Sequence, residues 1–102
     1  MKVVVKIPGK LASTLKVNPT LEVLQALVGG YIETLGVSEH ISLIVNECGK
    51  INGLPLNIYC PECRDYIAGT IVAVAHGADG ELRSLTEKEM DCIKVYFAQC
   101  MV

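Results

Sequence analysis

The chain has 102 residues, of which 51% are hydrophobic and 20% are charged, a composition typical of a folded protein rather than a disordered one. Its length fits one domain, residues 1–102, and needs no disulfide or metal to complete a core. The net charge is -2 and the Lys and Arg residues are scattered, which disfavours a nucleic-acid-binding protein with its usual basic stripe.

Five cysteines occur, an odd number, and residues 1–6 lack the apolar core and cleavage site of a signal peptide. The apolar runs are too short to span a membrane, so no membrane association is expected. We therefore expect a cytoplasmic protein whose cysteines are thiols or metal ligands rather than disulfides.

The first half is expected to form, in chain order, a strand at 3–7, a turn at 8–10, a second strand at 11–17 and a helix that follows Asn18-Pro19. Thr20 is the expected N-cap of this helix, and Gly29-Gly30 should end it. The alternative is a helix that continues through Tyr31 and Ile32, but two internal glycines would cost it about 2 kcal/mol relative to alanine.

The middle of the chain is expected to contain an extended segment at 31–35, a hairpin loop at 36–40, a strand at 41–46, a loop at 46–57, an irregular stretch at 58–66 and a strand at 67–75. The 67–75 strand is apolar at both alternating sets of positions. It should therefore lie in the centre of a sheet with both faces covered.

The C-terminal part should contain a turn at 78–81, a short extended piece at 82–85 and a final helix. Thr86 and Glu89 form a capping box at its start. One face of this helix carries Met90, Ile93, Phe97 and either Cys100 or Met101. The predicted fold is α+β: a mostly antiparallel sheet of about five to six strands with two helices packed on it.

The 46–57 loop is the most informative segment, because it mixes turn-forming residues with polar side chains that can bind a ligand. Asn46, Glu47 and Asn57 are expected to line a pocket at the end of the 41–46 strand, where amides and a carboxylate can recognise hydroxyls, amines or nucleobase edges. The alternative is that the asparagines only shape the turns.

Three segments of the chain together resemble the family known as domain of unknown function 3846, whose members are small proteins of bacteria, phages and other mobile elements. The segments are LQALVGGYIE at 24–33, NECGK at 46–50 with GLPLN at 53–57, and IAGT at 67–70 before SLT at 84–86. The resemblance covers nearly the whole chain. It implies a cytoplasmic, single-domain protein encoded by a phage or an integrated element, but it implies no reaction.

The positions that the resemblance implies as candidates are Gly29, Gly30, Tyr31, Glu33, Asn46, Glu47, Gly49, Gly53, Pro55, Asn57, Gly69 and Thr70. Two features depart from the family pattern. Cys48 stands where an acidic or polar residue is expected, and Cys60-Pro61-Glu62-Cys63 lies in a stretch that varies within the family.

Cys60 and Cys63 have the spacing of a knuckle that can hold one zinc ion, which needs four ligands in all. Cys48, a histidine (His40 or His76) or a second copy of the chain would have to complete the site. The alternative is a pair of reduced thiols in a loop.

The sequence thus predicts a non-enzymatic binding or host-modulating module that uses the 46–57 loop, with a host protein or a small metabolite as its partner. Tyr31 and Glu33 join the loop residues as candidate binding positions. One alternative is a small enzyme with Glu47 as acid or base, in which Asn57 orients the substrate; another is a zinc-stabilised interaction protein. The apolar end of the last helix also allows a homodimer.

Overall fold

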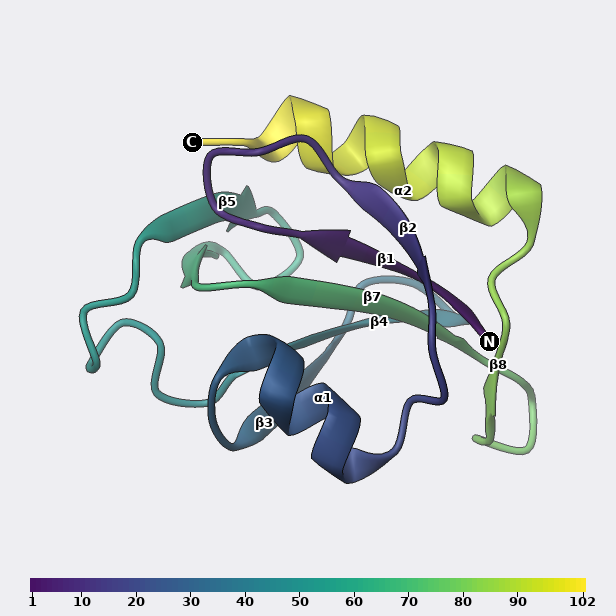
Figure 1. Cartoon of the computed structure of the whole chain (residues 1–102). Coiled ribbons are helices and arrows are strands. Elements are labelled where there is room, and N and C mark those ends of the chain that lie inside the picture. Colours follow the sequence, from purple (N-terminus) through teal and green to yellow (C-terminus); the bar gives the residue numbers. More distant parts are fainter.

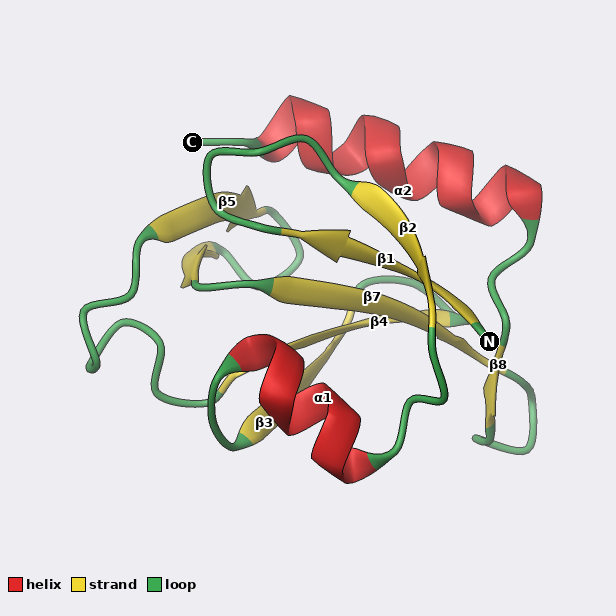
Figure 2. Cartoon of the chain, viewed as in Figure 1, coloured by secondary structure: helices red, strands yellow, loops and turns green.

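The central feature of the protein is a six-stranded sheet between two helical layers, seen in a computed structural model that describes all 102 residues (Figures 1 and 2). Its strands follow the order β2-β1-β7-β4-β3, and β8 pairs with β7. They are β1 (Lys2–Lys6), β2 (Ser13–Lys16), β3 (Ile32–Gly36), β4 (Ile41–Asn46), β7 (Ile71–His76) and β8 (Leu82–Arg83). Every strand pairing is antiparallel, which confirms the predicted α+β class.

Strand β7 lies in the middle of this sheet, and its side chains alternate between two separate cores. Ile71, Ala73 and Ala75 enter the larger core, which α2 (Glu87–Cys100) covers. Val72 and Val74 enter the smaller core on the opposite face, under α1 (Leu21–Val28). The expectation of a central strand with both faces covered is confirmed.

Helix α1 begins and ends at the residues that its sequence predicted. The Thr20 hydroxyl accepts a hydrogen bond from the Val23 N–H at 3.2 Å, and Gly29 has a left-handed φ of +79° at the C-terminal cap. Because only glycine adopts this conformation without strain, the helix ends there, and the chain is free to enter β3.

Helix α2 starts with the predicted capping box, in which the Thr86 hydroxyl and the Glu89 carboxylate each bind a backbone N–H of the other residue. Its buried side chains are Met90, Ile93 and Phe97, as expected. Neither helix is long and apolar enough to cross a membrane.

A second, two-stranded sheet consists of β5 (Leu56–Cys60) and β6 (Asp65–Ala68) and lies on the same face as α2. The prediction that 58–66 is irregular was therefore wrong. The segment is a hairpin in which Tyr59 pairs with Tyr66, and Arg64 at a φ of 54° closes the turn.

The prediction of one strand over 67–75 was also wrong, since Gly69 divides it. Gly69 has a φ of +88°, donates its N–H to Pro55 O at 2.8 Å, and separates β6 from β7. This break lets the chain pass from the small sheet to the large one.

Candidate functional site

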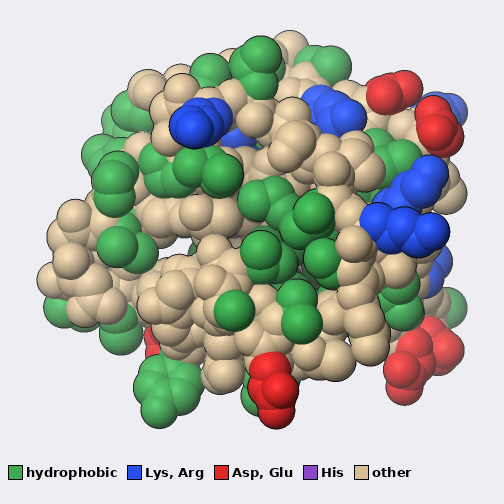
Figure 3. All heavy atoms as spheres, in the orientation of Figure 1, with side chains coloured by type: hydrophobic (Ala, Val, Ile, Leu, Met, Phe, Trp, Pro, Cys, Tyr) green, Lys and Arg blue, Asp and Glu red, His purple; other side chains and the backbone are tan.

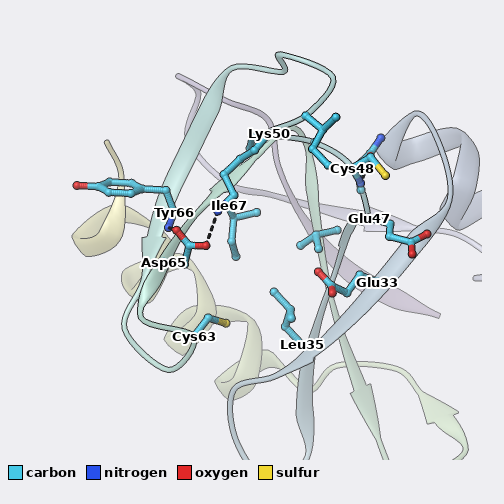
Figure 4. A pocket seen from close by; sticks show the side chains of 14 residues that line it. Glu33, Leu35, Glu47, Cys48, Lys50, Cys63, Asp65, Tyr66 and Ile67 are labelled. Carbon is cyan, nitrogen blue, oxygen red and sulfur yellow. Dashed lines mark hydrogen bonds and ion pairs between the residues drawn. The ribbon is translucent and has the colours of Figure 1, made fainter.

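A cavity lined by 14 residues lies between the edge strand β3, the 46–51 segment that follows β4, and strand β6 (Figure 4). It has a volume of about 250 Å³. Three pieces of chain that are distant in sequence meet here because the β5–β6 hairpin folds back over the end of β4. The cavity therefore lies at the end of β4, where the sequence predicted a pocket. Its β6 wall was not predicted from the sequence.

The cavity carries more negative than positive charge: three carboxylates, Glu33, Glu47 and Asp65, against one ammonium, Lys50. Lys50 is engaged, because its Nζ donates to the Asp65 carboxylate. That hydrogen bond and the Tyr66 N–H hold the Asp65 pKa below its usual range. The Glu33 and Glu47 carboxylates have no hydrogen-bond or ion-pair partner in the chain.

The two free carboxylates point in different directions in Figure 4. Glu33 projects from β3 toward the cavity, beside Leu35, whereas the Glu47 carboxylate points away from it. Glu33, an exposed residue of the edge strand, therefore contributes the free negative charge that faces the cavity, and Glu47 contributes charge at its margin.

The remaining wall is apolar. Leu35 on β3, Val45 on β4 and Ile67 on β6 line the interior. Ile51 and Tyr66 lie at the rim, with 87% and 46% of their surfaces exposed. An apolar wall with one inward carboxylate suits a ligand group that combines an alkyl stem with a positive charge.

The wall formed by the 46–51 segment depends on a close backbone approach at Gly49. A Cβ at this position would lie 2.6 Å from Ala68 O in β6. Only glycine permits that contact without movement of the backbone.

Asn46 anchors the start of the same segment rather than facing a ligand. Its Nδ2 donates to Val28 O at 3.1 Å, and its Oδ1 accepts the Cys48 N–H at 2.8 Å. The side chain joins the end of α1 to the loop. Asn46 contributes to the lining of the cavity, but both polar atoms of its amide are already engaged.

Asn57 lies outside the cavity and is fully buried. Its Nδ2 donates to Lys6 O at 2.7 Å and to Gly69 O at 2.8 Å, while its Oδ1 accepts from Lys6 Nζ at 3.0 Å. Lys6 Nζ also donates to Ile7 O at 3.1 Å, and burial lowers the Lys6 pKa. This pair links β1 to β5 and the β6–β7 break.

Of the five predicted binding residues, Glu33, Asn46 and Glu47 line the cavity, and Tyr31 and Asn57 do not. Tyr31 is 76% exposed at the start of β3. Sequence reasoning missed Lys50, Asp65 and Ile67. Asp65 and Ile67 lie on β6 of the β5–β6 hairpin. The sequence signal for that hairpin was the pair of tyrosines, Tyr59 and Tyr66, on either side of the 61–64 turn.

The thiols of Cys60 and Cys63 lie together, with their Sγ atoms 2.8 Å apart. Cys60 is fully buried, and Cys63 lines the cavity, as does the exposed Cys48. Burial, the hydrogen bond to Cys60 and the negative charges of Cys60, Glu62 and Glu33 raise the Cys63 pKa to about 12. At neutral pH this thiol is protonated and therefore a poor nucleophile.

Two thiols supply half of the ligands that tetrahedral zinc requires. No group of three or more His, Cys, Asp or Glu side chains in this chain is placed to hold a metal ion. The structure brings Cys60 and Cys63 together but places neither His40 nor His76 with them.

A family model described as Domain of unknown function (DUF3846) matches residues 1–99. The chain belongs to this family. No curated protein and no solved structure gives a significant match.

Most glycines that the DUF3846 resemblance implied as candidates serve the backbone. Gly29, Gly53 and Gly69 have left-handed φ values of +79°, +71° and +88°, and Gly49 allows the contact with β6. Among the implied polar positions, only Glu33 and Glu47 offer unpartnered charged groups at the cavity of this DUF3846 protein.

On the face shown in Figure 3, hydrophobic side chains lie over the middle and charged ones mainly toward the periphery.

Proposed function

We propose that the protein is a non-enzymatic binding module whose cavity between β3, the 46–51 segment and β6 accepts a cationic group on an apolar stem, such as a lysine or arginine side chain. The observation that carries this proposal is the Glu33 carboxylate, which points toward the cavity without a partner and stands beside Leu35. A ligand cation would supply the missing partner.

The size of the cavity supports a side chain rather than a large metabolite. Its volume of about 250 Å³ is below the range of about 300–1,000 Å³ in which drug-sized ligands are held. The exposed apolar rim at Ile51 and Tyr66 offers contact surface beyond the bound group.

The charge also supports a cation. The negative field of Glu33 extends to the Cys63 thiol and helps to raise its pKa. The same field attracts an ammonium or guanidinium group and repels a carboxylate. The family resemblance implies a phage or mobile-element origin, and the proposed partner is therefore a host protein that presents such a group.

An enzyme that uses Glu47 with Asn57 has weaker support. The Asn57 amide is buried and engaged with Lys6 and Gly69, so it is not available to orient a substrate beside Glu47.

The proposal is tested by titrating the protein with N-acetyl-lysine methylamide and following backbone amide shifts by NMR. Shifts should concentrate at Glu33, Lys50 and Ile67 and weaken as salt is added. Glu33→Gln should bind about threefold to fivefold more weakly, as expected for one partly exposed charge pair.

Glu22→Gln is the matched control, since Glu22 is an exposed carboxylate on α1 and does not line the cavity. The corresponding glutamate derivative should not bind. Equal binding of the lysine and glutamate derivatives, or no loss in Glu33→Gln, would contradict the proposal.

A further inference from the structure

Strand β3 is an edge of the large sheet, and one of its sides has no hydrogen-bond partner. Two hydrogen bonds show which residues of this segment face β4: Glu47 N–H donates to Tyr31 O at 2.9 Å, and Val37 N–H donates to Ile41 O at 3.1 Å. The odd-numbered residues of β3 therefore bond to β4. Ile32, Thr34 and Gly36 turn their N–H and C=O groups outward.

The opposite edge of the sheet, β2, is protected in a way that β3 is not. Lys16 lies on β2 and pairs with Lys2 of β1, so two positive side chains flank that edge. Lysines on an edge strand are a common device against pairing with another chain. The β3 sequence, Ile-Glu-Thr-Leu-Gly, contains neither lysine nor proline.

The cavity adjoins the free edge of β3 and opens on one face of it. Glu33 and Leu35 point to the face that carries the cavity, while Ile32 packs against the core on the α1 side. A strand added beside β3 would place every second side chain on the cavity face. One of these side chains would lie next to Glu33.

We propose that an extended peptide segment containing a lysine or arginine adds to the β3 edge as a further strand and places that side chain in the cavity. This inference rests on the proposed function and names the partner class. Hydrogen bonds from the outward groups of Ile32, Thr34 and Gly36 hold the peptide backbone, and the Glu33 carboxylate selects the side chain.

Charge favours such a peptide over a second copy of this chain. A copy docked by its own β3 would bring another Glu33 and another Glu47 to an edge that already carries two unpartnered carboxylates. Like charges brought together across paired strands are destabilising.

The test uses a short peptide with one central lysine between alternating valine and threonine residues, titrated into the intact protein by calorimetry. The peptide should bind at least tenfold more tightly than N-acetyl-lysine methylamide, because the outward backbone groups add hydrogen bonds to the contact in the cavity. Thr34→Pro removes one outward N–H without removing a bond to β4, and should weaken peptide binding about tenfold.

Lys16→Pro is the matched control, since the Lys16 N–H points outward from the opposite edge. It should leave peptide binding unchanged. A second peptide carries N-methyl groups on the amides that would bond to β3. It should bind the unaltered protein only as weakly as N-acetyl-lysine methylamide does, which tests the edge without any protein variant.

The outcomes separate the two proposals. If the peptide binds no more tightly than the lysine derivative, and Thr34→Pro and N-methylation have no effect, the edge does not bind peptide although the cavity does. If neither probe binds, the proposed function itself fails. Concentration-dependent dimerisation lost in Thr34→Pro, without peptide binding, would assign the edge to a second copy.

Discussion

Two polar clusters lie near opposite ends of the 46–57 segment, and they differ in whether their polar groups have partners. Around Asn57, the amide and the Lys6 ammonium are buried and bonded to each other and to backbone carbonyls. Around Glu33 and Glu47, the carboxylates remain without a partner beside an open cavity. The presence of unpartnered groups, rather than polarity itself, separates the cavity cluster from the buried link.

Removing the buried link should have the largest effect. Asn57→Ala leaves the buried Lys6 ammonium with Ile7 O alone and removes the Asn57 donor from the carbonyls of Lys6 and Gly69. We expect a loss of about 3 kcal/mol in the free energy of unfolding, measured by urea denaturation.

Asn52→Ala is the control for that substitution, because Asn52 is exposed in the same segment. It should change the free energy of unfolding by less than about 0.5 kcal/mol. Equal stability of the two variants would remove the distinction between the clusters.

Gly49→Ala should alter the cavity cluster and leave the buried link intact. Because the new Cβ would meet Ala68 O at 2.6 Å, the 46–51 segment must move away from β6. We expect a cost of about 2 kcal/mol and weaker binding of the lysine derivative.

Gly36→Ala provides the comparison for Gly49→Ala, since a Cβ at Gly36 meets no atom within 4 Å. It should preserve both stability and the binding of the lysine derivative. A Gly49→Ala variant with native stability would show that the close approach does not constrain the wall.

The Cys63 thiol should make the stability of the cavity wall depend on alkaline pH. The folded chain holds this proton up to about pH 12, whereas the unfolded chain loses it near the ordinary pKa of 9.0. Between these values the folded state binds more protons, so the free energy of unfolding falls as the pH rises. The free energy of unfolding, measured by denaturation at a series of pH values from neutral to alkaline, should fall less steeply with pH in Cys63→Ser. Cys92→Ser, on the exposed surface of α2, should keep the original dependence on pH.

The smallest expected effect concerns the field of Glu33. Its charge is a minor contributor to the raised Cys63 pKa, after burial, Cys60 and Glu62. Glu33→Gln should lower that pKa slightly and speed alkylation of Cys63 at a fixed alkaline pH, followed by mass spectrometry. Glu47→Gln, whose carboxylate points away from the cavity, should leave the rate unchanged.

Local signals predicted the elements whose ends depend on neighbouring residues. Thr20 and Gly29 define α1, and Thr86 with Glu89 defines the start of α2, because each cap is a bond between residues close in sequence. The continuous apolar run of β7 likewise predicted a strand covered on both faces.

The hairpin β5–β6 was missed because its local signal, one tyrosine on either side of the 61–64 turn, is weak. Its strands are short, and the apolar run from Ile67 continues past Gly69 into β7 without a break in hydrophobicity. The division at Gly69 is stabilised by Asn57 and Pro55, which bond to its backbone from another part of the chain.

The sequence by itself determined the family, the α+β class and the caps of both helices. Only the tertiary structure decided which polar residues are free. Asn57 and Glu47 look equally available in the sequence, yet folding buries the first against Lys6 and leaves the second exposed. Whether a polar group keeps an unused bond depends on partners that the chain brings together from distant positions, and these partners are set only when the sheets pack.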